Sequence, residues 1–315
     1  MKILGLDQNL GFNKKFKKVL LIKKPNHQNS NLALKSILEF FSNQIPKTIS
    51  PILEDDLINL KSKLDIDLVI ALGGDGTILH ISHLFKNIPC PPILGFNFGT
   101  IGFLLPFPPI DYCNVIIKVL SGQINTEKRM RLNCSLLTNQ NQPHSNSLLQ
   151  LGAINEIHLH RSKCPHPIAI NISIQEKLLT QALTDGLIIA TPTGSTAYSC
   201  SAGGPILYPN MQNIVMTPIC PQSLSFRPVV LPSDLKIKLT LDPSSRSTAE
   251  LAIDGIPIKT IHPNQSIEIY RSNHPIQLFS PCSESSVNDS WINDLNLMLN
   301  FNKTYQPKLS NPPKT

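Results

Sequence analysis

A cluster of glycines follows a short, strongly apolar run of this chain. Residues 68–72 (LVIAL) lead directly into Gly73-Gly74-Asp75-Gly76-Thr77. A short, partly β-branched run that ends in glycines predicts a buried parallel strand that turns sharply into a loop. The apolar residues that follow recur at helical spacing: Ile78, Leu79, Ile81 and Leu84. We therefore expect a strand, a glycine loop and a helix in direct succession.

Asp75 gives this loop its chemical interest. In an open α/β sheet, ligands bind at the carboxyl ends of the strands, where glycines let the backbone approach phosphates. A carboxylate repels phosphate unless it takes a proton from a hydroxyl group or helps to hold a metal. The alternative is structural: Asp75 caps the helix, and the glycines form a tight turn. The loop alone favours neither interpretation.

Length and charge narrow the class of protein. The chain has 315 residues, enough for two domains with sizeable cores. Its 28 basic and 21 acidic residues give a net charge of +7, which suits anionic ligands. No basic patch is interleaved with aromatic residues, which argues against nucleic acid as a partner. No apolar run is long enough to span a bilayer, so we expect no membrane partner.

The cysteines and the N-terminus bear on the compartment. The seven cysteines are odd in number, widely spaced and free of any CxxC pair, which argues for a reducing compartment and against a zinc site. The first 24 residues are basic, with Asp7 as the only acid, and faintly resemble an organelle transit peptide. We interpret residues 1–17 as a solvated basic tail and expect a cytoplasmic protein, with organellar targeting as the alternative.

The first part of the chain alternates strands with helices. We expect strands at 18–22, 67–72 and 93–97, and helices at 32–41, 57–64 and 115–120. This alternation predicts a mostly parallel sheet in a Rossmann-like α/β domain over residues 18–125. The strand at 93–97 ends in a second glycine-punctuated loop at 98–104, so the two loops are expected to share one crevice.

From residue 126 the pattern changes to short alternating strands. The expected strands cover 131–137, 152–160, 168–174, 178–182, 186–190, 214–218, 235–241, 249–253 and 266–270. Few helical periods lie between them, so we expect residues 126–281 to form a β-rich second domain. Residues 282–302 are expected to form a C-terminal helix that packs on the body and returns to the first domain. Residues 303–315, rich in proline and lysine, are expected to be disordered.

The β-rich part carries the longest informative stretch. Asn155-Glu156 places two adjacent polar residues in an apolar strand, where they must face opposite sides. Asp185-Gly186 opens another strand, which runs into the hydroxyl- and glycine-rich block Thr191–Tyr198. Closely spaced donors of this kind suit purine edges, ribose hydroxyls and phosphates. The alternative is a Ser/Thr-rich loop that only caps a helix.

Together these motifs closely resemble the NAD kinase family. The GGDG loop at 73–76, the second loop at 97–104, Asn155-Glu156 and the block at 191–198 all match its signatures. Residues 217–221 and 224–228 are similar to the eukaryotic branch. The resemblance covers about residues 18–302. The GGDG loop alone also occurs in diacylglycerol and sphingosine kinases and in phosphofructokinases, whereas the block at 191–198 is far more specific.

The resemblance implies phosphorylation of the adenosine-ribose 2′-hydroxyl of NAD, or of NADH, by ATP with Mg²⁺. Asp75 would be the catalytic base, and no residue is assigned as a metal ligand. The residues that would bind the nucleotides are Gly73, Gly74, Gly76, Thr77, Phe98, Asn155, Glu156, Asp185, Thr193, Thr196, Ala197, Tyr198 and Ser201. Within this set, Asn155 and Glu156 would hold the adenosine, Asp185 would lie near the nicotinamide and Phe98 near adenine. The family also implies a homo-oligomer.

Three departures from the family pattern leave other functions open. Gln222 stands where the eukaryotic branch usually has histidine, while His160 and Ile256 replace other usual residues. A lipid kinase would share the GGDG loop but would not need the block at 191–198. A non-catalytic NAD(P)(H)-binding sensor would explain the departures but not an intact Asp75. The choices between NAD and NADH, and between ATP and polyphosphate, cannot be read from the sequence.

Overall fold

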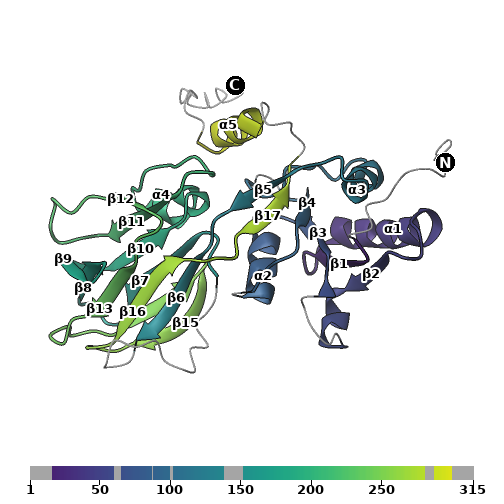
Figure 1. Cartoon of the computed structure of the whole chain (residues 1–315). Helices are drawn as coiled ribbons and strands as arrows, with labels where there is room; N and C mark the ends of the chain where they lie inside the picture. Colours follow the sequence, from purple (N-terminus) through teal and green to yellow (C-terminus); the bar gives the residue numbers. More distant parts are fainter. Residues whose placement is uncertain are drawn as a thin grey trace, which may run out of the picture.

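The computed structural model describes residues 16–59, 65–86, 88–99, 102–137, 152–280 and 287–299. Figure 1 shows an α/β part that contains the N-terminal strands and helices, a β-rich part beside it, and helix α5 (Val287–Leu299) above them. This arrangement confirms the expected fold class. The carboxyl-terminal helix expected near residue 291 is also confirmed.

A six-stranded sheet forms the centre of the α/β part. Its strands lie in the order β2-β1-β3-β4-β17-β5. Their bounds are β1 (Lys18–Lys23), β2 (Ser50–Leu53), β3 (Leu68–Gly73), β4 (Ile93–Asn97), β5 (Thr126–Arg129) and β17 (Ile276–Phe279). All neighbours are parallel except the pair of β17 and β5. The glycine loop therefore lies at the carboxyl end of a central parallel strand.

Helices cover both faces of this sheet. On one face, α1 (Gln28–Gln44) and α3 (Tyr112–Leu120) pack through buried residues such as Ile37, Phe40 and Ile116. On the other face, α2 (Asp75–Phe85) packs through Ile78 and Ile81, which are both fully buried. Since both faces are covered, the uninterrupted apolar run in β3 is the composition that a parallel strand requires.

Two strands that follow residue 125 complete this first sheet. β5 and β17 come from the stretch that we assigned to the second domain, yet they pair with each other and β17 also pairs with β4. Each has only four residues, so neither carries a periodic signal that would assign it to one sheet. The chain thus crosses from one domain to the other near β5 and returns at β17.

Two antiparallel sheets form the β-rich part, in the orders β12-β11-β10-β7-β14-β15 and β6-β16-β13-β8-β9. The first contains β7 (Glu156–Arg161), β10 (Gly186–Ala190), β11 (Asn213–Ile219), β12 (Val229–Pro232), β14 (Ala249–Ile253) and β15 (Ile256–Ile261). The second contains β6 (Leu132–Leu137), β8 (Ile168–Ile174), β9 (Lys177–Thr184), β13 (Ile237–Leu241) and β16 (Ser266–Arg271). Alternate residues of both sheets share one core, including Ile157, Leu187 and Leu239.

Some local expectations were wrong. Of the helix expected over 57–64, residues 57–59 instead belong to a 3₁₀ helix, η1 (Glu54–Asn59), and residues 60–64 lie outside the described residues. The first turn of η1 carries three acids that favour a helix start. The strand expected from residue 152 begins only at Glu156, because the preceding amides bond to a side chain described below. Strands β12 and β15 were not expected. The basic tail and the disordered tail lie outside the described residues, apart from residues 16 and 17.

The described part of the chain also bears on membranes and disulfides. None of its helices is long and apolar enough to cross a membrane. Its six cysteines are all free thiols.

Candidate active site

The two glycine loops meet at the carboxylate of Asp75. Helix α2 begins at this residue, with Gly74 as its N-cap. The carboxylate turns away from its own helix: Oδ2 accepts a hydrogen bond from the Phe103 amide at 3.0 Å, and Oδ1 accepts one from the Leu104 amide at 3.1 Å. The Asp75 side chain therefore does not cap α2, and the shared crevice of the two loops is confirmed.

Burial sets the protonation of Asp75. Loss of solvent raises the pKa of its carboxyl group above the usual value, and the amides of Phe103 and Leu104 lower it in part. A carboxylate with a raised pKa accepts a proton more readily than an exposed one, which is the property that a general base needs near neutral pH.

A cavity of about 320 Å³ opens in front of Asp75. It brings Asp75 together with four of the residues that the sequence singled out, all from the β-rich part: Asn155, Thr193, Thr196 and Ala197. Gly102, Phe103 and Leu104 form its wall on the α/β side, and Met298 of α5 also lines it. The cavity therefore lies between the two domains and includes a residue of the carboxyl-terminal helix.

Some hydroxyl groups of the block at 191–198 hold the loop in its conformation, and another is left without a partner beside the cavity. After β10 the chain forms the 3₁₀ helix η3 (Thr193–Thr196) and the short helix α4 (Tyr198–Ser201). The Thr191 hydroxyl donates to the Ile154 carbonyl, and the Ser195 hydroxyl donates to the Pro192 carbonyl at 2.6 Å. These two side chains fix the loop, whereas buried Thr193 Oγ1 has no hydrogen-bond partner among the described residues.

Asp254, in the turn between β14 and β15, holds Asn155 and Glu156 in place. Its carboxylate accepts hydrogen bonds from the amides of Ile154 (2.9 Å), Asn155 (2.8 Å) and Glu156 (3.1 Å). Burial and, to a smaller extent, the negative charge of Asp254 raise the pKa of Glu156, the Tyr198 amide lowers it in part, and the result is a pKa of about 7. Glu156 Oε2 is buried without a hydrogen-bond partner in the described structure.

A second, open cavity of about 560 Å³ follows the same strand toward its end. His158 and His160 of β7 stack there, and the Tyr198 ring meets His158 edge-on. Burial, with a smaller effect of His160, lowers the pKa of His158 to about 4, so its ring is neutral at pH 7. Asp185 lines this cavity and pairs with Arg161 at 2.9 Å.

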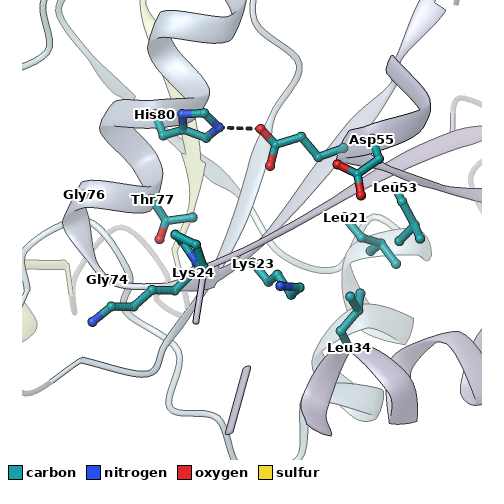
Figure 2. Close-up of a pocket in the computed structure, with 12 residues that line it drawn as sticks. Leu21, Lys23, Lys24, Leu34, Leu53, Asp55, Gly74, Gly76, Thr77 and His80 are labelled. Atoms are coloured by element: carbon teal, nitrogen blue, oxygen red, sulfur yellow. Dashed lines mark hydrogen bonds and ion pairs between the residues drawn. The ribbon is translucent and has the colours of Figure 1, made fainter. Parts of the chain in front are cut away.

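A larger cavity of about 780 Å³ lies on the other side of the glycine loop and is drawn in Figure 2. Gly74, Gly76 and Thr77 line it, with Lys23 and Lys24 at the end of β1. Leu21, Leu34 and Leu53 give it an apolar part. His80 and Glu54 also line it, and His80 Nε2 forms a hydrogen bond of 2.5 Å with Glu54 Oε1 (Figure 2). None of these lysine, histidine and glutamate residues was predicted from the sequence, because no short motif marks them.

Four of the predicted site residues line none of these cavities: Gly73, Phe98, Glu156 and Ser201. Gly73 lies at the end of β3, where its carbonyl accepts the Phe98 amide at 2.7 Å. Phe98 packs against the α/β core and meets His27 edge-on, and Ser201 is exposed at the end of α4. Of the departures, Ile256 is 47% exposed on β15 and Gln222 is exposed after β11, where its amide donates to the Leu183 carbonyl.

The fold and these cavities define a two-domain nucleotide-binding protein whose glycine-loop carboxylate lies between an α/β domain and a β-rich domain. The family model of the ATP-NAD kinase N-terminal domain matches residues 19–124, and that of the C-terminal domain matches residues 154–280. The NAD kinase of Shewanella frigidimarina is 34% identical over 87% of this chain and 89% of its own length. The chain belongs to the NAD kinase family.

Other relatives agree with this assignment. A mitochondrial NADH kinase of Schizosaccharomyces pombe is 40% identical over 77% of this chain, and the match spans 61% of that protein. The crystal structure of a yeast NADH kinase complexed with NADH has a TM-score of 0.80 at 33% identity, with 93% of this chain and 90% of that chain covered. An NAD kinase from Archaeoglobus fulgidus in complex with ATP has the same fold, with a TM-score of 0.69 at 24% identity.

Proposed function

We propose that this protein transfers the γ-phosphoryl group of ATP to the adenosine-ribose 2′-hydroxyl of NAD or NADH, with Asp75 as general base. The observation that carries the proposal is the half-buried Asp75 carboxylate, held by the amides of Phe103 and Leu104 at the edge of a cavity between the domains. Phosphoryl transfer depends on positioning and charge neutralisation, and a carboxylate that accepts the hydroxyl proton orients the nucleophile. Family membership and the names of the relatives support this reaction.

The dinucleotide would occupy the cavity in front of Asp75 and the open cavity lined by His158 and His160. Its adenosine ribose would lie at Asp75, beside Asn155 and Thr193, with the 2′-hydroxyl toward the carboxylate. The nicotinamide end would extend toward Tyr198 and Asp185 in the open cavity. Two of the relatives are named NADH kinases, which supports NADH as one acceptor. The pairing of Asp185 with Arg161 leaves less negative charge to favour the cationic nicotinamide of NAD.

ATP would occupy the larger cavity across the glycine loop. Its apolar part would receive the adenine base near Leu34 and Leu53, and its phosphates would lie between Lys24 and the glycine loop. A lysine and glycine-loop amides are the groups that hold phosphates in many nucleotide sites. Glu54 and Asp55 line the same cavity, so the phosphates would point away from them, toward Asp75.

The residues present fit a magnesium ion that arrives with ATP. No group of three or more histidine, cysteine or acidic residues that could hold a metal occurs in the described part of the chain. Mg²⁺ is commonly held by one or two carboxylates and substrate phosphates, and each Asp75 oxygen keeps a lone pair beyond its amide bond. When bound there, Mg²⁺ would neutralise charge on the phosphates.

The test is formation of NADP and NADPH by purified protein with Mg-ATP, run in parallel on NAD and NADH. Wild-type protein should turn over, and Asp75→Asn should lower kcat by about 10²–10⁴-fold, as expected for loss of a general base. The variant should still bind dinucleotide, measured by calorimetry. Binding by the wild-type protein without turnover would defeat the kinase proposal and favour an NAD(P)(H) sensor. Phosphorylation of diacylglycerol or sphingosine instead would favour a lipid kinase.

We further propose a cytoplasmic homo-oligomer, as the resemblance and the composition imply. Strand β9 is an edge strand with exposed Leu178 (67%) and Leu179 (50%), which supports contact with a second copy. Light scattering after size exclusion would measure the mass. The match to a mitochondrial relative gives the alternative compartment, which imaging of a tagged full-length protein would distinguish.

A further inference from the structure

Helix α2, which begins at Asp75, is attached to the β-rich domain by contacts at and just beyond its carboxyl end. The Ser82 hydroxyl donates to the Gly152 carbonyl at 3.2 Å. Arg131, which is fully buried, donates to the carbonyls of Lys86 at 2.6 Å and Ile88 at 2.9 Å, just after the helix. Between these contacts, His83 Nε2 lies 3.5 Å from Asp254 Oδ2. The helix that carries the base is thus fixed against the other domain.

Asp254 is the point where this attachment meets the dinucleotide cavity. Its carboxylate is fully buried and accepts the three successive amides of Ile154, Asn155 and Glu156. One of those residues, Asn155, lines the same cavity as Asp75. The Asp254 backbone has φ 46°, and its amide donates to the Glu156 carbonyl at 3.0 Å, so the turn itself is held against the strand that it positions.

The contact with His83 is a close approach of 3.5 Å rather than a hydrogen bond. His83 Nε2 is buried and has no hydrogen-bond partner among the described residues, and the Asp254 carboxylate is the acidic group that faces it. A buried carboxylate needs donors or positive charge on each side. Three amides satisfy one side of Asp254, and the imidazole ring of α2 covers the other.

We propose that Asp254 is a positioning residue, which sets Asn155 and Glu156 in register with Asp75 through His83 of α2. This inference rests on the proposed function. Asp254 itself would not contact the substrate. It would act on the dinucleotide through the segment 154–156 and on the catalytic base, Asp75, through α2. Its loss should therefore impair dinucleotide binding and transfer together, and leave ATP binding intact.

Asp254→Asn is the direct test, because an asparagine keeps one acceptor and presents an NH₂ group to amides that need the other. The Kd for NADH, measured by calorimetry, and the KM for NADH should both rise about tenfold, as for a buried donor left unpaired. The KM for ATP should stay within about twofold of the wild-type value, because the ATP cavity is a separate site and changes at distant sites are nearly independent. Asp242→Asn is the matched control. Asp242 also binds several side chains at a turn, but it lies at the end of β13 in the other sheet.

His83→Leu supplies a second variant in case Asp254→Asn does not fold. It should weaken NADH binding in the same direction, and the double variant should be less impaired than the product of the two single effects. Folded variants that melt at lower temperature but keep the wild-type Kd and KM for NADH would overturn the proposal. If the wild-type protein binds NADH without turnover, the kinase proposal fails, while the Kd comparison still tests the role of Asp254.

Discussion

A Cβ atom at Gly102 would stand 2.5 Å from Oδ1 of Asp75. The second glycine loop therefore comes so close to the carboxylate that no other residue fits at this position without moving it. The adjacent amides of Phe103 and Leu104 reach Asp75 only because of this approach. Gly102 thus belongs to the machinery that orients the base, although it has no side chain.

We predict that Gly102→Ala displaces the Asp75 carboxylate and lowers kcat by roughly 10²-fold, the effect of a misplacement of about 1 Å. The Kd for ATP should remain unchanged, since the ATP cavity lies across the other loop. Steady-state kinetics measures kcat, calorimetry measures the Kd for ATP, and a thermal melt shows whether the variant is folded. Equal kcat for Gly102→Ala and wild type would contradict the role of this close approach.

We predict that Lys24→Ala raises the KM for ATP about tenfold or more, because a charge-assisted bond to phosphate is lost. The Kd for NADH should not change, because Lys24 lines only the larger cavity among those described. Lys118→Ala, an exposed lysine on α3, is the control for loss of one positive charge. If Lys24→Ala instead weakens NADH binding and spares ATP, the assignment of the two cavities is reversed.

Glu156 should make stability depend on pH. Its pKa is about 7 in the folded protein, above the value of 4.5 for an ordinary glutamate. Because the folded-state value is raised, the stabilising contribution is fully present below about pH 4.5 and is lost as pH rises through 7. The difference corresponds to about 3 kcal/mol against the folded state above pH 7.

Glu156→Gln should therefore raise the free energy of unfolding at pH 8 by up to about 3 kcal/mol relative to wild type, and change it little near pH 4.5. The amide oxygen can still accept the Tyr198 N–H bond. Urea denaturation of both proteins between pH 4.5 and 8.5 measures the difference. A constant difference across this range would show that Glu156 titrates normally.

Much of the fold followed from local patterns. The apolar run of β3 and the glycines after it predicted the strand, the loop and α2, because both periodicity and backbone freedom are properties of neighbouring residues. The strand patterns after residue 126 predicted the β-rich domain for the same reason. The assignment of β5 and β17 to the first sheet did not follow, since a strand of four residues carries no pattern that assigns it to one sheet rather than another.

The sequence by itself determined which groups can do the chemistry: Asp75 in its glycine loop, Asn155-Glu156 and the hydroxyl-rich block at 191–198. Tertiary structure alone decided how they act together. It turned the Asp75 carboxylate toward Phe103 rather than its own helix, used Thr191 and Ser195 to hold the loop, and made Asp254 the acceptor for amides about 100 residues earlier. The physical reason is that burial and long-range hydrogen bonds depend on which segments pack together, and no local pattern records that.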